Sequence, residues 1–244
     1  TLWGANAVNG AIHIITKKAK DTQGALITAG CGTEERAFAT LRYGGTIGNV
    51  LSYRLYGKGF ERDSTSGTDG NHDNWRMGRT GGRLDWEPST QDSVTLQGDY
   101  YHGLAGQMTS FPTLLAPSFS RSAIEDIRMS GGNVLGRWKH QFGSQNEMIL
   151  QLYYDNTRRN ELSFMEIRNT VDVDFQHRAA LPFGQDLVWG IGYRVSGDLL
   201  RNSENLAFDP PEQSLRTFSA FVQDEIKLFQ DKLRNISKTR IQEG

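Results

Sequence analysis

Alternation of apolar and polar residues over long runs is the feature that most constrains this chain. In residues 93–101 the even positions hold Val, Leu, Gly and Tyr, while the odd positions hold Ser, Thr, Gln, Asp and Tyr. The same period recurs in 147–155, 169–176 and 189–198, and helical stripes are scarce. Alternation with a period of two is typical of strands with one apolar and one polar face, so the sequence predicts an all-β fold.

The alternating segments and their connections predict an antiparallel sheet with two different rims. Short connections alternate along the chain with longer polar ones, which include 61–74, 103–129, 159–168 and 201–213. Because successive antiparallel strands end on opposite rims, this order gathers the short turns on one rim and the long loops on the other. The ten predicted strands are 24–32, 36–44, 50–60, 75–87, 93–102, 130–142, 147–158, 169–180, 185–200 and 214–228.

Strand length and aromatic placement favour a membrane barrel over a soluble sandwich. The predicted strands match or exceed the roughly 9–11 residues that a tilted strand needs to cross a bilayer. Aromatic residues near strand ends suit the interfacial girdles of such barrels. We therefore predict an antiparallel transmembrane β-barrel. The aromatic residues on which this depends are Tyr43, Trp86, Tyr100, Tyr154, Trp189 and Phe218.

Charge, cysteine content and motifs exclude several functional classes. The 27 Lys and Arg residues nearly balance the 28 Asp and Glu residues, which argues against a protein that binds nucleic acid regardless of sequence. The single cysteine, Cys31, excludes a disulfide framework and a zinc site built on paired cysteines. Nucleophile-elbow, zinc-protease and P-loop motifs are all missing from the sequence. We therefore expect neither an enzyme nor a cofactor.

The first 23 residues do not follow the alternating pattern. Residues 2–12 read LWGANAVNGAI, and Ile-Ile-Thr-Lys and then Asp-Thr-Gln-Gly follow. This stretch resembles the end of the plug domain of TonB-dependent outer-membrane receptors. Residues 218–226, FSAFVQDEI, are similar to a barrel-strand motif of the branch that includes siderophore, cobalamin and colicin receptors. The positions that carry the plug motif are Trp3, Gly4, Asn6, Ala7, Asn9, Gly10 and Thr16.

The resemblance implies a plug folded inside a 22-stranded barrel, of which this chain would hold about ten strands. It divides the chain into the end of the plug (1–23), the N-terminal part of the barrel (24–233) and a disordered or disrupted tail (234–244), because the alternation collapses after Leu233. It also implies a monomer, when complete, in the outer membrane of a Gram-negative cell. The TonB complex, with ExbB and ExbD, would act through an N-terminal segment that is missing from the sequence.

The function implied by the resemblance is energised uptake of a metal chelate, with a ferric siderophore ahead of cobalamin. Two other readings stay open: a passive porin-like channel, and a receptor remnant without a function of its own. Residues 1–23 count against the porin, because a porin needs no such segment before its first strand.

Cationic and aromatic residues of the long loops are the candidates for ligand binding. Guanidinium groups suit carboxylate or catecholate oxygens, and aromatic rings suit planar chelates. The alternative for each arginine is an ion pair with a lumenal acid such as Asp85, Glu87 or Asp99. The candidates are Arg62, His72, Trp75, Arg76, Arg79, Gln107, Met108 and Phe111.

No metal centre is expected, apart from one weak calcium candidate. Asp69, Asn71 and Asp73 occupy positions 1, 3 and 5 of a calcium-loop pattern. The pattern then fails, because Asn74 replaces its glycine and Thr80 replaces its bidentate glutamate. A solvated turn rich in Asp, Asn and Gly is the alternative.

Overall fold

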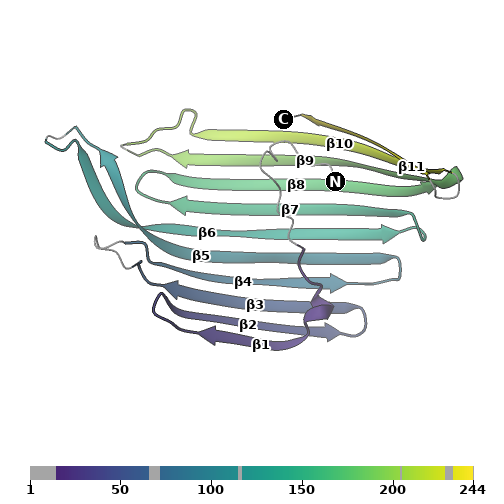
Figure 1. Cartoon of the computed structure of the whole chain (residues 1–244), viewed down its shortest axis with the longest axis horizontal. Helices are drawn as coiled ribbons and strands as arrows, with labels where there is room; N and C mark the ends of the chain where they lie inside the picture. Colours follow the sequence, from purple (N-terminus) through teal and green to yellow (C-terminus); the bar gives the residue numbers. More distant parts are fainter. Residues whose placement is uncertain (1–14, 66–71, 115–116, 204, 229–232, 244) are drawn as a thin grey trace.

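The chain forms one antiparallel sheet in a computed structural model, which describes residues 15–65, 72–114, 117–203, 205–228 and 233–243. Every strand pairs with its neighbours in sequence, so the order across the sheet is β1 to β11 (Figure 1). The strands are β1 (Gly24–Gly30), β2 (Glu35–Ile47), β3 (Leu51–Arg62), β4 (Trp75–Trp86), β5 (Asp92–Pro112), β6 (Ser120–Gln141), β7 (Glu147–Asn160), β8 (Met165–Leu181), β9 (Gln185–Arg201), β10 (Glu212–Leu228) and β11 (Leu233–Glu243). The predicted antiparallel all-β fold is confirmed.

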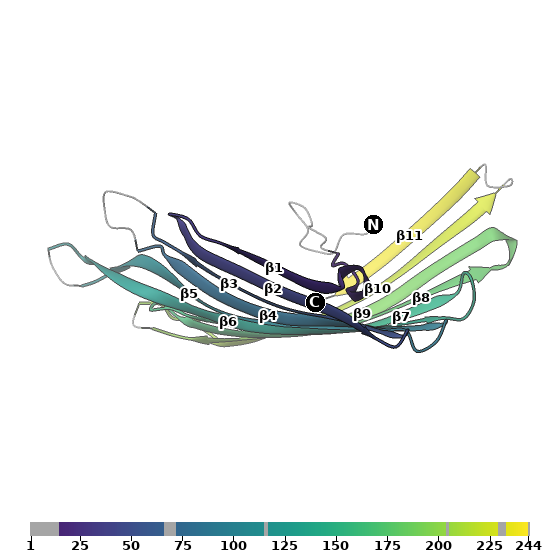
Figure 2. The same cartoon turned by 90° about the horizontal axis from the view of Figure 1, so that it is seen from below.

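The sheet curves into an open trough. Figure 2 shows the short 3-10 helix η1 (Ala19–Thr22) on the inner, concave side of this trough. In the described residues β1 and β11 each pair on one side only, so they are the two edges of the sheet. The sheet therefore has the curvature of a barrel wall without being closed into a barrel.

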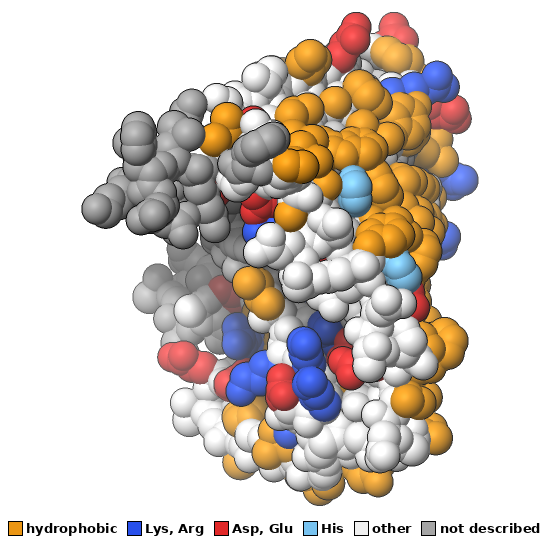
Figure 3. Space-filling model, turned by 90° about the vertical axis from the view of Figure 1, so that its right-hand side faces the viewer, with side chains coloured by type: hydrophobic (Ala, Val, Ile, Leu, Met, Phe, Trp, Pro, Cys, Tyr) orange, Lys and Arg blue, Asp and Glu red, His pale blue; other side chains and the backbone are white. Residues whose placement is uncertain are grey.

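The two faces of the sheet differ as the alternation predicts. Hydrophobic side chains gather on the convex side, on the right in Figure 3, which views the molecule from the short-turn end. Within the described residues only Ala19 and Ile127 are buried hydrophobic side chains, so the apolar residues are not enclosed in a core. The convex face therefore suits contact with lipid. Its exposed apolar side chains include Leu41, Leu55, Leu84, Trp86, Leu96, Val134, Trp138, Leu152, Val171, Ile191 and Val222.

An aromatic belt lies along the convex face near the short turns. The Trp189 indole donates to His177 Nδ1 at 3.2 Å, and the rings of His140 and Phe142 meet edge to face with centroids 4.6 Å apart. At the first residue of β5, Asp92 accepts a hydrogen bond from the Trp138 indole at 3.0 Å and lies 2.7 Å from His140 Nδ1. The belt suits the interface between lipid and water.

The connections are sorted between the two rims, although the outer loops are shorter than predicted. One rim holds the turns 48–50, 87–91, 142–146 and 182–184, and the opposite rim holds 63–74 and 202–211. The prediction of a loop over 103–129 is wrong. β5 and β6 pair continuously from Asp92 with His140 to Pro112 with Ser120, and this hairpin extends beyond its neighbours at the left of Figure 1. Its backbone ladder continues although the lipid-facing alternation has ended.

The prediction of a disordered tail over 234–244 is also wrong for residues 234–243. They belong to β11, whose backbone pairs with β10 from Leu228 with Leu233 to Phe218 with Glu243. Backbone hydrogen bonds can satisfy the open edge of β10 whatever the side chains are. Loss of the apolar alternation therefore did not imply loss of the strand.

Among the described residues, no helix has the length and apolar character needed to cross a membrane.

Candidate functional site

The N-terminal segment (residues 15–23) is attached to the concave face by Asp85 of β4. The Ala19 amide donates to Asp85 Oδ2 at 2.7 Å, and Ala19 is fully buried. Arg83, two residues away on the same face, holds both Asp85 oxygens at 2.8–3.0 Å, and Thr95 Oγ1 adds a bond at 2.9 Å. The side chains of Arg83 and Asp85 are each 13% exposed. This carboxylate therefore joins the segment to two strands at once.

Two arginines extend the attachment to the rest of the segment. Arg54 Nη1 of β3 donates to the Lys17 carbonyl at 3.1 Å and to Thr22 Oγ1 at 3.3 Å. Arg83 Nη1 donates to Thr16 Oγ1 at 2.8 Å. Guanidinium groups have several donors in a fixed geometry, so one side chain can hold both a strand residue and the segment. We call the group of Arg54, Arg83 and Asp85 the segment anchor.

Gly44 of β2 gives the segment room to approach the sheet. A Cβ at this position would lie 2.3 Å from the Thr22 carbonyl oxygen and 3.1 Å from its carbon. Both atoms belong to the backbone, so the clash could be relieved only by moving the segment. Because Gly44 has no side chain, residues 15–23 can lie close to β2.

Gly44→Ala is expected to displace the segment and to destabilise the protein by about 1–3 kcal/mol, the usual cost of overpacking. Gly57→Ala, where a Cβ meets nothing within 4 Å, is the matched control. Amide hydrogen exchange of residues 16–23 measures the difference. Equal protection in the two variants would show that the segment does not need the close approach at Gly44.

Ion pairs cover much of the remaining concave face. Arg79 lies 2.7 Å from Asp99, and Arg194 lies 2.8 Å from Asp172. Arg168 contacts Asp198, and Arg178 contacts Asp186. The predicted alternative for a lumenal arginine, pairing with an acid on the same face, is thus observed for the ligand candidates Arg79 and Arg62; Arg62 lies 3.3 Å from Glu35. A charged concave face opposite an apolar convex face is what a polar lumen requires.

The candidate ligand residues divide between the two faces of the sheet. The concave group contains Arg62, whose guanidinium carbon lies 4.9 Å from the Trp75 ring centroid and 5.1 Å from that of Phe60. Gln107 lies on the same face and donates to Glu125 at 2.8 Å. Arg76, Met108 and His72 lie toward the convex face; His72 Nε2 is 3.0 Å from Asp126 there.

Phe111 lines a pocket near the loop-bearing rim that the sequence did not reveal. The pocket has a volume of about 490 Å³. It joins the end of the β5–β6 hairpin to the connections 161–164 and 202–211. Arg121, opposite Phe111 in the ladder, is exposed and has no carboxylate within 4.0 Å among the described residues. The other residues that line the pocket are Pro112, Thr113, Ala123, Leu162, Ser203 and Asn205.

Arg121 was missed because it lies inside the segment predicted as a loop. The β5–β6 register brings it opposite Phe111, whereas the sequence separates the two by ten positions.

The calcium candidate and most of the plug motif stay predictions. Asp69 and Asn71 lie outside the described residues, as do Trp3, Gly4, Asn6, Ala7, Asn9 and Gly10. Asp73 accepts a hydrogen bond from the Thr65 amide at 2.8 Å, and its other oxygen bonds the Thr65 hydroxyl. The described part of the chain contains no group of three or more His, Cys, Asp or Glu residues that could hold a metal ion.

Solved structures of siderophore receptors share this fold. The ferripyoverdine receptor of the Pseudomonas aeruginosa outer membrane superposes with a TM-score of 0.67 at 14% identity, over 93% of this chain and 38% of the receptor. A variant of the ferric enterobactin receptor PfeA of that organism superposes with a TM-score of 0.64 at 15% identity, over 97% of this chain and 41% of the receptor. The siderophore receptor PirA of Pseudomonas aeruginosa superposes with a TM-score of 0.61 at 17% identity, over 84% of this chain and 33% of the receptor.

The chain therefore spans between a third and about two fifths of these receptors. No family model matches the sequence, and no curated protein matches it. The structural similarity shows the fold: the antiparallel sheet of this chain matches part of these siderophore receptors, in keeping with the fold that the resemblance implied.

Proposed function

We propose that this chain forms part of the plug and barrel of a TonB-dependent outer-membrane receptor that takes up a ferric siderophore. The observation that carries the proposal is the segment anchor. A segment bound on the concave face by Arg54, Arg83 and Asp85 favours a lumen blocked by a plug. A blocked lumen prevents passive flow, so transport through it needs a ligand signal and an energy source.

The arginine and aromatic side chains of the rim pocket and of the concave face favour a chelate with anionic oxygens and aromatic rings. Arg121 beside Phe111 in the rim pocket offers a cation next to an aromatic ring. Arg62, between Phe60 and Trp75, is a second cation beside aromatic rings on the same face, and it also pairs with Glu35 at 3.3 Å. Catecholate oxygens would accept from the guanidinium groups, and their rings would stack on the aromatic side chains. Arg76 and Met108 are not part of this proposal because they face the other way.

Uptake of radioactive iron by cells of the native host tests the proposal. Ferripyoverdine and ferric enterobactin, the ligands of two of the similar receptors, are the first probes. Deleting the gene is expected to abolish uptake of one ferric siderophore, and removing TonB or collapsing the proton-motive force should have the same effect. Uptake that is independent of TonB would support a passive channel, and unchanged uptake of every siderophore after deletion would support a remnant.

A further inference from the structure

The segment anchor carries more positive than negative charge. Arg54 and Arg83 are directly opposite each other in the β3–β4 register, an arrangement that destabilises a sheet when the charges are alike. Asp85 neutralises Arg83, whereas no carboxylate of the described residues lies within 4.0 Å of Arg54. Arg54 instead donates to two uncharged oxygens, those of the Lys17 carbonyl and the Thr22 hydroxyl. One of the two guanidinium charges is therefore not balanced.

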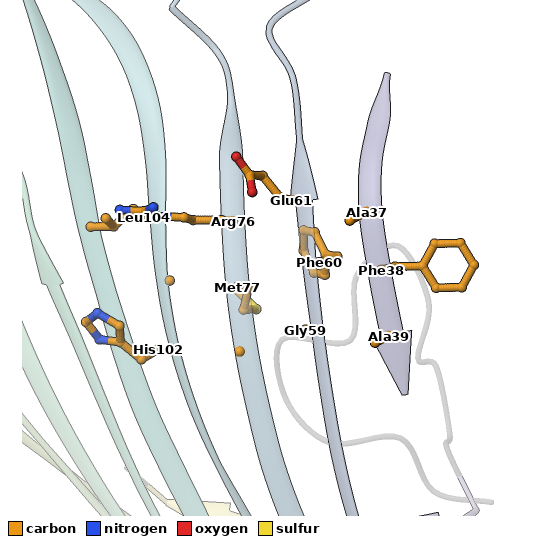
Figure 4. Close-up of a pocket in the computed structure, with 12 residues that line it drawn as sticks. Ala37, Phe38, Ala39, Gly59, Phe60, Glu61, Arg76, Met77, His102 and Leu104 are labelled. Atoms are coloured by element: carbon orange, nitrogen blue, oxygen red, sulfur yellow. The ribbon is translucent and has the colours of Figure 1, made fainter. Parts of the chain in front are cut away.

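A third arginine, Arg42 of β2, lies beside the anchor on the same face. In Figure 4 Phe38 of β2 and Arg76 of β4 point to opposite sides of the sheet, so Phe38 lies on the concave side. Arg42 follows Phe38 by four residues and shares its face, because side chains alternate along a strand. Its partner in the ladder is Tyr56, two residues from Arg54. The charges of Arg42 and Arg54 are close enough to repel each other.

The Arg42 side chain lacks a partner of its own. Its Nε is buried without a hydrogen bond, and its guanidinium group has no carboxylate within 4.0 Å in the described part of the chain. Leaving a buried charged donor without an acceptor costs free energy. Arg42 and Arg54, which we call the arginine pair, thus lack an anion. Other arginines of the concave face have carboxylate partners, among them Arg79, Arg168, Arg178 and Arg194.

A polar pocket of about 420 Å³ lies next to the anchor, beside the short turns 48–50 and 87–91. Lys18 and Lys20 of the N-terminal segment line it together with Arg83. Neither lysine has a carboxylate within 4.0 Å among the residues described. Of the two acids in its lining, Asp85 is held by Arg83, and Glu87 lies at the start of the turn 87–91. Hydroxyl groups supply further donors, from Thr46, Ser52, Ser93 and Thr95.

The arginine pair suits an anion with several oxygens. Each guanidinium group presents its donors in a planar fork that fits two adjacent anionic oxygens, as in a carboxylate or a catecholate. A charge-assisted hydrogen bond is roughly twice as strong as one between uncharged groups. An anion that reaches Arg54 would therefore compete with the Lys17 carbonyl and the Thr22 hydroxyl for its donors.

We propose that Arg42 and Arg54 form a second site in the lumen for the anionic oxygens of the transported chelate, and that the bound chelate takes the Arg54 donors from the N-terminal segment. Loss of those two bonds loosens residues 15–23, which lie between the arginine pair and the polar pocket at the short-turn rim. The site is separate from the rim pocket, which lies near the opposite rim. The inference rests on the proposed function in taking an anionic chelate as the occupant.

Isothermal titration of the purified receptor in detergent tests the site directly. Citrate is the probe, because it carries several carboxylates on a small molecule, and its trimethyl ester is the uncharged comparison. The titration uses the Arg121→Ala background, in which the rim pocket has lost its cation. Citrate is expected to bind this variant at a single site, and the ester is not. Failure of citrate to bind would overturn the proposal.

Substitution of Arg42 locates the bound citrate. Arg42→Gln in the same background is expected to weaken binding by about tenfold, since it removes one charge-assisted contact. Arg42→Lys keeps the charge and should recover part of the affinity. Arg137→Gln is the matched control, because Arg137 also lies on the concave face but is bonded to the uncharged Gln151. Unchanged affinity in Arg42→Gln, or an equal loss in Arg137→Gln, would contradict the proposal.

Hydrogen exchange tests the competition for Arg54. Saturating citrate is expected to speed the exchange of the amides of residues 16–23 in the Arg121→Ala background, and to have no such effect once Arg42→Gln is added at the same citrate concentration. The amides of β8 are the internal reference, because this strand does not contact the segment anchor. Equal protection of residues 16–23 with and without citrate would show that the anion does not displace the segment.

Uptake kinetics separate this inference from the proposed function. Arg42→Gln in the otherwise unchanged receptor should lower the maximal rate of siderophore uptake by about tenfold and leave the dissociation constant at the cell surface unchanged, because the rim pocket is intact. A receptor that binds citrate at the arginine pair but transports no siderophore would leave the anion site standing and overturn the proposed function. Siderophore uptake at the wild-type rate in Arg42→Gln would do the reverse.

Discussion

Asp85→Ala is expected to release the N-terminal segment from the sheet. The substitution removes the acceptor of the Ala19 amide and leaves Arg83, which is largely buried, without its carboxylate. Breaking a buried ion pair by removing one partner typically costs about 3–5 kcal/mol. Part of this cost is expected to appear as local opening of residues 16–23 before the sheet itself unfolds.

Hydrogen exchange at Ala19 measures that opening. A local loss of about 3 kcal/mol corresponds to a roughly 100-fold increase in the exchange rate of an amide that is protected by the same opening. Asp172→Ala, which breaks the Arg194 ion pair at the other end of the sheet, is the matched control and should leave Ala19 protected. Slow exchange at Ala19 in Asp85→Ala would show that the anchor does not depend on this carboxylate.

The same variant tests the idea of a blocked lumen. If Asp85 helps to hold a plug, Asp85→Ala should admit small hydrophilic antibiotics into cells that carry the complete receptor, and Asp172→Ala should not. Resistance equal to that of the wild type, together with fast exchange at Ala19, would mean that the segment moves without opening a path.

Arg121→Ala is expected to have the largest effect on ligand binding. Its guanidinium group lines the rim pocket and has no carboxylate partner among the described residues. A chelate could therefore bind this group without first breaking an ion pair. Loss of one charge-assisted hydrogen bond weakens binding by about 10–100-fold. Titration of the purified receptor with the ferric siderophore found in the uptake experiment gives the dissociation constant.

Two controls give the Arg121 result its meaning. Arg36→Ala removes an exposed arginine that pairs with Glu61 and Asp63, away from the pocket, and should leave the affinity unchanged. Arg121→Lys keeps the charge but loses the planar fork of donors, so it should recover part of the affinity. Equal affinity in Arg121→Ala and the wild type would place the ligand elsewhere.

The period-two alternation was enough to predict the strands, because each face of a strand repeats its environment every two residues. This is why 147–158 and 185–200 were located to within a few residues as β7 and β9. The same rule failed where apolar and polar side chains do not alternate along a strand. The outer halves of β5 and β6 and the whole of β11 are held by backbone pairing with a neighbour, and backbone bonds leave little trace in the side-chain pattern.

By itself the sequence determined the class of the protein: an antiparallel sheet with one apolar and one charged face, preceded by a segment of another kind. Only the tertiary structure decided which residues meet. The bond from Ala19 to Asp85 spans 66 positions, and the one from Arg83 to Thr16 spans 67. Such contacts depend on strand register and on how the sheet curves around the segment. Both are properties of the whole sheet, because each strand's position is set by the strands on either side of it.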